Sequence, residues 1–191
     1  MGTTILSNGK IIDGLGNRPF VGHVLIKGDR IEAVLKEDQT LPSADTIIDA
    51  SGCAIAPGFI DMHSHADWVL PSVNHPKLLK GFLEQGITTI VAGNCGISPA
   101  PVNHDRLHSL EWHNVASVCL DEPLNYTWRS MGEFLDKIEQ LHPVVNVAQL
   151  VGHGAIKCSV ANTPNGTMKS EELKACLTEL RSALDQRGHV D

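Results

Sequence analysis

The chain has 191 residues, 42% of them apolar, and its 15 basic and 22 acidic residues give a net charge of −7. This composition predicts an ordinary globular protein and argues against a nucleic-acid-binding or anionic-membrane-binding surface. The start has no charged segment followed by a long apolar run, and no apolar run approaches a membrane span, so we expect a cytoplasmic protein. Five scattered cysteines without a Cys-x-x-Cys pair do not indicate a disulfide framework.

Residues 1–56 are predicted to form a small all-β domain of the β-sandwich kind. Short β segments separated by turn residues are expected at 3–6, 10–13, 22–27, 30–35 and 46–49, with a break at Asn8-Gly9. The pair Gly28-Asp29, which lies between two apolar runs, is typical of a hairpin turn. His23 lies within a strand pattern, where we expect an exposed or structural role.

Residues 57–191 alternate between predicted strands and helices. Buried strands are expected at 59–62, 87–92 and 144–151, separated by turn residues and by a long, irregular, partly helical excursion at 100–129. Such alternation is typical of a parallel sheet with crossover helices, so the fold class is α/β.

Three helices are predicted among these strands. The first begins near Pro76 and ends before Gly86, and the second follows a capping-box pattern at residues 130–133. The third, over residues 170–186, has an apolar stripe formed by Leu173, Leu177, Leu180 and Leu184.

Side chains capable of binding a metal follow the predicted strands. His63 and His65 point the same way because strand side chains alternate, and Cys95 follows the next strand. Neighbouring strands lie roughly 4.8 Å apart, so the three side chains can reach one ion, and imidazole with thiolate suits zinc. Asp67 and His153 are candidates for supporting these ligands without binding the metal, although Asp67 could instead cap a loop.

Other histidines are weaker candidates. His104, His108 and His113 lie in the irregular excursion without the regular spacing of a metal site, so we do not assign one there. His189 and Asp191 follow a predicted helix rather than the carboxyl end of a strand, and we do not count them as ligands.

Two motifs carry a family resemblance. Residues 57–65, with the sequence PGFIDMHSH, resemble the start of the catalytic domain of the amidohydrolase superfamily. Residues 86–101, GITTIVAGNCGISPAP, resemble the D-aminoacylase or N-acyl-D-amino-acid deacylase family, and residues 144–154 are similar to the third-strand region of that family.

The resemblance implies a metal-dependent (β/α)8 TIM barrel in which His63, His65 and Cys95 bind zinc. It also implies hydrolysis of the linear amide C–N bond of a small-molecule N-acyl-D-amino acid. The two further ligand histidines and the acid/base aspartate of the family have no counterpart here. A closed barrel takes about 250 residues, so we expect about three βα units after Pro57 and a chain that is inactive alone.

Two alternatives remain open. A cyclic amidohydrolase of the dihydroorotase or hydantoinase kind shares the fold and the His-x-His start, whereas Cys95 in its Gly-Asn-Cys-Gly setting favours the deacylase. The other alternative is a truncated, non-catalytic product that binds a metal or a partner. An incomplete barrel exposes a strand edge, so self-association through this edge is expected.

Overall fold

The computed structural model describes residues 2–111, 123–161 and 166–186. The chain divides into two compact units, Met1–Pro57 and Gly58–Asp191. No helix within the described ranges has the length and apolar character needed to cross a membrane. The expectations for His113, His189 and Asp191 fall outside the described residues.

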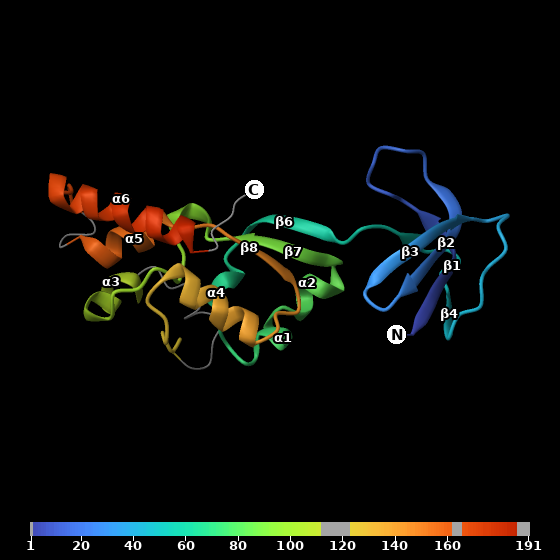
Figure 1. Cartoon of the computed structure of the whole chain (residues 1–191), viewed down its shortest axis with the longest axis horizontal. Helices are drawn as coiled ribbons and strands as arrows, with labels where there is room; N and C mark the ends of the chain where they lie inside the picture. Colours follow the sequence, from blue (N-terminus) through green and yellow to red (C-terminus); the bar gives the residue numbers. More distant parts are fainter. Residues whose placement is uncertain (1, 112–122, 162–165, 187–191) are drawn as a thin grey trace. The chain divides into compact units, whose positions relative to one another are not determined.

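The described part of the N-terminal unit is one mixed sheet rather than the two layers of a sandwich. Its strands lie in the order β3-β2-β1-β4, and β5 also pairs with β1 (Figure 1). Neighbours among β1, β2 and β3 are antiparallel, whereas β4 and β5 are parallel to β1. The strands are β1 (Thr3–Ile11), β2 (Phe20–Lys27), β3 (Arg30–Lys36), β4 (Thr46–Asp49) and β5 (Ala54–Ile55).

The expected break at Asn8-Gly9 is a bulge within a continuous β1. The pairing register of β1 with β2 shifts between Leu6 and Gly9, and Asn8 has a φ of 61°. The Asn8 main-chain N–H donates to Nδ1 of the buried His23 at 3.1 Å. Because a bulge tolerates turn residues inside a strand, the sequence pattern predicts two short strands where the chain forms one. The same bond gives His23 a structural role.

The predicted hairpin turn is confirmed. Lys27 pairs with Arg30 across the end of β2 and β3, which leaves Gly28-Asp29 as a two-residue connection. Gly28 has a φ of 62°, a conformation that a tight hairpin turn requires and that glycine adopts without steric cost.

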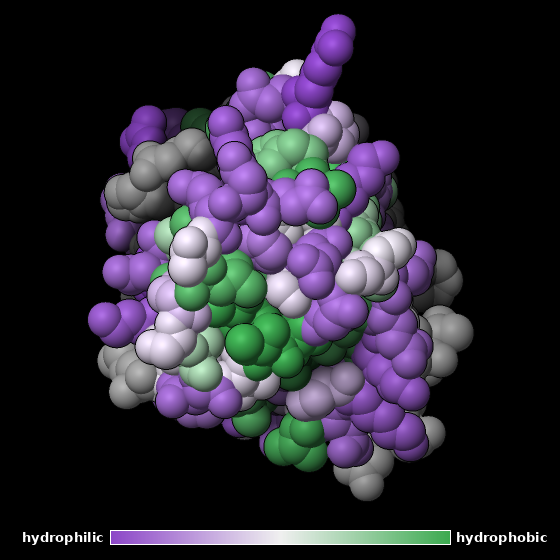
Figure 2. Space-filling model, turned by 90° about the vertical axis from the view of Figure 1, so that its right-hand side faces the viewer, coloured by the Kyte–Doolittle hydropathy of each residue, from purple (hydrophilic) through white to green (hydrophobic). Residues whose placement is uncertain are grey.

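Several large apolar side chains of the N-terminal unit are exposed. Figure 2 shows apolar side chains gathered among polar ones on a face of the molecule. The exposed apolar residues of this unit include Leu15, Ile31, Val34, Ile47 and Ile48.

In the second unit, three parallel strands form a sheet in the order β6-β7-β8 (Figure 1). These strands are β6 (Phe59–Ser64), β7 (Ile87–Ala92) and β8 (Asn146–Gln149). The helices are α1 (His75–Leu78), α2 (Lys80–Glu84), α3 (Leu107–Glu111), α4 (Met131–Gln140), α5 (His153–Val160) and α6 (Ser170–Asp185). Because the strands are parallel, their carboxyl ends and the loops that follow meet at one edge of the sheet.

The predicted capping box of α4 is confirmed. Ser130 Oγ accepts a hydrogen bond from the Glu133 N–H at 3.2 Å, and Glu133 Oε2 accepts one from the Ser130 N–H at 3.3 Å. This reciprocal pair satisfies main-chain donors that the first helical turn leaves free.

Two helix predictions need correction. The helix expected before Gly86 is split into α1 and α2 at Leu79, which has φ −89° and ψ 4°. The sequence pattern also did not predict α5, which begins at His153 directly after the loop that follows β8. Gly152 and Gly154 flank this start, and their loop-like composition masks a helix that has no side-chain cap.

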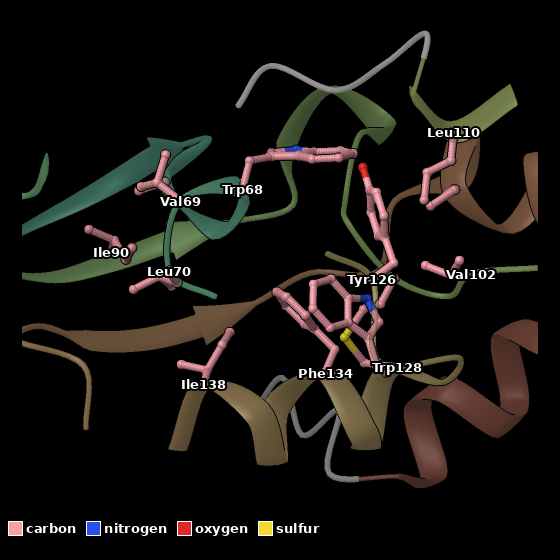
Figure 3. Packing of buried hydrophobic residues seen from close by; sticks show 14 of the residues in the cluster. Trp68, Val69, Leu70, Ile90, Val102, Leu110, Tyr126, Trp128, Phe134 and Ile138 are labelled. Carbon is pink, nitrogen blue, oxygen red and sulfur yellow. The ribbon is translucent and has the colours of Figure 1, made fainter. Parts of the chain in front are cut away.

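The core of the second unit lies between the sheet and α4 (Figure 3). Trp128 is buried there, its ring centroid lies 5.2 Å from that of Phe134, and its Nε1 donates to the Pro99 carbonyl at 2.7 Å. Trp68 and Ile138 belong to the same cluster. Residues of the irregular excursion thus supply a large part of this core.

The prediction that the strands of this unit are buried is wrong for β6, and in β8 only Gln149 is buried. Phe59, Ile60 and Met62 of β6 are 63%, 58% and 66% exposed. A parallel sheet is usually covered on both faces, and no described residue covers these side chains. Sequence alone shows that a strand is apolar but not whether a layer covers it.

The apolar stripe of α6 is also more exposed than its spacing implies. Leu173, Leu177 and Leu184 are exposed, whereas Cys176 and Ala183 are the buried apolar positions. The helix also contacts α5. The packed face therefore lies beside the leucine stripe.

Candidate metal centre

His63 and His65 lie where β6 ends. His63 is the penultimate residue of the strand, and His65 directly precedes the short 3-10 helix Ala66–Trp68. Their ring centroids are 5.7 Å apart, and the ring planes meet at 75°. The alternation of strand side chains therefore brings both imidazoles to the same edge of the sheet.

Cys95 lies in the loop after β7, within the 3-10 turn Asn94–Gly96, and its thiol meets the histidine pair. The distance from Cys95 Sγ to His63 Nε2 is 3.2 Å. Cys95 has a φ of 58°, which is uncommon for a residue other than glycine. The Asn94 side-chain amide donates to the carbonyls of Val91 and Ser64, at 2.8 and 3.3 Å, which ties this turn to both strands.

Among the described residues, His63, His65 and Cys95 form a cluster suited to a single ion. One ligand atom from each side chain lies within 4.8 Å of the other two. Zinc bonds of about 2.0–2.3 Å in a tetrahedron place ligand atoms roughly 3.5 Å apart, so the cluster has the right size. Two imidazoles and a thiol are also ligands that zinc accepts.

A buried polar atom in this cluster has no protein partner. His65 Nδ1 is buried without a hydrogen bond to any described residue. Buried nitrogens are normally satisfied, so a ligand from outside the chain fits this site. The chemistry of the donors and this unsatisfied nitrogen both agree with a metal at the strand ends.

A cavity of about 530 Å³ opens beside the histidine pair. It has polar walls at Asp61 and His63 and apolar walls at Trp68, Leu79 and Phe82. Small-molecule sites commonly combine an apolar lining with a few polar groups in this way.

Asp67 is fully buried and faces β8 rather than the histidines. Its Oδ2 accepts a hydrogen bond from Gln149 Nε2 at 2.9 Å. Burial raises the pKa of Asp67 to about 7, an effect that hydrogen bonds from Gln149 and from main-chain groups, including that of Gly93, partly offset. Gln149 was not among the predicted site residues, and the only sequence signal for it was an amide at the end of an apolar strand.

His153, the other residue expected to support the ligands, is exposed and begins α5. Within the described residues its ring makes no hydrogen bond to His63, His65 or Cys95. In the excursion, His104 Nε2 contacts the Trp128 carbonyl at 2.9 Å, so this histidine contributes to the fold.

Comparison with known proteins places the chain in a family. The model of the amidohydrolase family matches residues 46–179. An N-acyl-D-glutamate deacylase of Alcaligenes xylosoxydans xylosoxydans is 36% identical over 95% of this chain, and a D-aminoacylase of the same organism is 35% identical over 90%. The chain spans 35% and 33% of these relatives, about a third of their length.

Solved structures give the same result. A D-aminoacylase with a binuclear metal centre superposes with a TM-score of 0.80 at 32% identity, over 97% of this chain and 37% of the other. An N-acyl-D-glutamate deacylase from Bordetella bronchiseptica, complexed with zinc and a phosphonate inhibitor, has a TM-score of 0.75 at 30% identity, over 95% and 36%. The chain therefore belongs to the amidohydrolase family, with D-aminoacylases and N-acyl-D-amino-acid deacylases as homologues over about 95% of its length.

Proposed function

We propose that this chain carries the metal-binding segment of a zinc-dependent N-acyl-D-amino-acid deacylase, a hydrolase of linear amide C–N bonds. The observation that carries the proposal is the convergence of His63, His65 and Cys95 from two neighbouring strand ends, with ligand atoms within 4.8 Å. The deacylase homologues support the substrate class, because their names state activity on N-acyl-D-glutamate and related compounds.

In this proposal the residues of the chain hold and orient the metal. His63 and His65 offer neutral imidazole nitrogens, and Cys95 binds as the thiolate, so loading the site releases a proton from the thiol. The chemistry that a bound zinc supplies is polarisation of a carbonyl oxygen and a lower pKa for water. The cavity beside the histidines gives a small substrate room next to the site.

We further propose that the chain does not hydrolyse substrate by itself. About two thirds of the length of its relatives has no counterpart in these residues. A general base must contact the reacting water, and the acid/base aspartate that the family resemblance implies has no counterpart among these residues. The remaining βα units of the proposed barrel, with the family's aspartate, would have to supply that base.

Metal binding and turnover test these proposals separately. The purified chain, freed of metal and titrated with Zn²⁺, is expected to bind about one ion, and Cys95→Ser is expected to lose at least tenfold in affinity. Cys53→Ser is the matched control, because Cys53 is also exposed but lies in the other unit. Equal affinity for all three proteins would contradict the metal centre, and zinc-dependent hydrolysis of N-acetyl-D-glutamate would contradict the inactivity.

Self-association through the exposed edge of β6 is a second proposal. Phe59, Ile60 and Met62 present apolar surface on a strand whose outer main-chain groups pair with no described strand. Exposed apolar edge strands are templates for pairing with another chain. This property is independent of the metal centre.

A further inference from the structure

The carboxyl ends of β6, β7 and β8 are in register, and a buried side-chain pair bridges them. Ser64 pairs with Ala92, and Ala92 pairs with Gln149, so the three residues form one row across the sheet. Asp67 follows the first strand and Gln149 ends the third. Strands two positions apart are about 10 Å apart, so the 2.9 Å bond between these side chains passes over the end of β7.

Gly93, the first residue after β7, provides the space for this bond. A Cβ at Gly93 would lie 2.8 Å from Gln149 Nε2 and would collide with the Leu150 carbonyl oxygen. Gly93 also has a φ of 83°, which other residues rarely adopt. The backbone there is consequently fixed between the Asp67–Gln149 pair and the chain that leaves β8.

The turn that begins at Gly93 presents Cys95. Gly93, Cys95 and Gly96 all have positive φ, and a non-glycine residue keeps such a conformation only where its surroundings impose it. On the far side, the Gly96 carbonyl lies against the start of α5, because a Cβ at Gly152 or Gly154 would be 2.7 Å from that oxygen. The turn is thus confined between the α5 start and the Asp67–Gln149 pair.

The hydrogen-bonded pair of Asp67 and Gln149 is buried away from solvent. Asp67 is 0% exposed and Gln149 is 9% exposed. Gln149 Nε2 also donates to the Leu150 carbonyl at 3.0 Å, which orients the amide toward the turn. Burying a carboxylate is costly unless it is hydrogen-bonded, and the bond from Gln149 supplies part of the compensation at Asp67.

We propose that Asp67 and Gln149 are positioning residues for Cys95. Their hydrogen bond over Gly93 holds the left-handed turn in the conformation that brings the Cys95 thiol to His63 and His65. This inference rests on the proposed function, since it assigns the pair a purpose in building the metal centre. It also specifies the ligand that Asp67 supports, which is Cys95.

The test uses the full chain with Asp67→Ala and Gln149→Met, each of which removes one partner of the bond, and with the double variant Asp67→Asn/Gln149→Glu. In the double variant, the amide introduced at position 67 can donate to the carboxylate introduced at position 149, so the bond returns with exchanged roles. Co²⁺ titration reports affinity and the thiolate-to-cobalt charge-transfer band, and hydrogen exchange of residues 93–97 reports the turn in the metal-free chain. Ser130→Ala is the control, because it removes the α4 cap without touching the site.

Each single variant is expected to weaken Co²⁺ binding about 10- to 100-fold, to reduce the thiolate band and to speed exchange at residues 93–97. The double variant is expected to recover most of each loss, whereas Ser130→Ala lowers the melting temperature alone. If Asp67→Ala does not fold, Gln149→Met keeps the side-chain volume and removes the donor, and the same losses are expected from it. Single variants that retain wild-type affinity and exchange would overturn the inference.

The two proposals fail in different ways. A wild-type chain that binds no Co²⁺ overturns the metal centre, and hydrogen exchange still decides the positioning role, which fails if residues 93–97 exchange equally in wild type and Asp67→Ala. A wild-type chain that binds Co²⁺ through Cys95, with Asp67→Ala unchanged in both readouts, leaves the metal centre standing and overturns the positioning role.

Discussion

At the scale of single residues, the Cys95 turn depends on glycine at position 93. We expect Gly93→Ala to lower the free energy of unfolding by about 2 kcal/mol or more, because alanine is strained at positive φ and its Cβ meets the Leu150 carbonyl. Gly81→Ala is the matched control in α2, where a Cβ meets nothing, and it is expected to raise stability by about 0.5–1 kcal/mol. Urea unfolding measures both, and equal effects would contradict this account.

How far the sequence defines the site depends on the kind of residue. His63, His65 and Cys95 could be selected because their chemistry is visible and strand alternation fixes their direction. Gln149 and Gly93 could not be selected, because their roles arise from the register of three strands and from a carbonyl that approaches from β8. No local sequence pattern indicates that Gln149 and Gly93 come together across the sheet.

At the scale of elements, the α4 capping box makes stability depend on pH. Hydrogen bonds from the main chain at Arg129 and Ser130 lower the pKa of Glu133 below its ordinary value of 4.5. The ionised carboxylate therefore stabilises the fold above pH 4.5, and this contribution is lost as the pH falls through the lower folded-state pKa.

Glu133→Gln tests this dependence. The variant is expected to be about 0.5 kcal/mol less stable than wild type at neutral pH, because the exposed side chain makes only a modest cap. The difference in free energy of unfolding between the variant and wild type is expected to disappear in acid, as measured by urea unfolding from about pH 7 to about pH 2.5. A gap that persists unchanged in acid would show that the carboxylate charge is not its cause.

Elements with strong local sequence signals were predicted better than features that depend on bulges, glycine-flanked helix starts or covering layers. The strand β7, the helix α4 and the hairpin of β2 and β3 follow from apolar runs, a capping box and a Gly-Asp turn. The continuity of β1 and the existence of α5 did not follow, because a bulge and a glycine-flanked helix start have the composition of loops. Burial of β6 was mispredicted because it depends on a covering layer.

At the scale of the whole molecule, the exposed apolar strand β6 predicts self-association. We expect wild-type chain to form oligomers that dissociate on dilution, because pairing of β6 with another chain would satisfy its free edge. Met62→Lys is expected to reduce association, whereas Val73→Lys, which replaces a similarly exposed apolar residue outside the strands, is expected to have little effect. Sedimentation velocity over a concentration series measures this, and a wild-type monomer throughout the series would contradict it.

The proposed metal centre is formed by His63, His65 and Cys95. X-ray absorption at the zinc edge of the metal-loaded chain tests this most directly. We expect one sulfur ligand at about 2.3 Å together with nitrogen or oxygen ligands at about 2.0–2.1 Å, and loss of the sulfur contribution in Cys95→Ser. A zinc environment of nitrogen and oxygen alone, or one that Cys95→Ser leaves unchanged, would contradict the central claim.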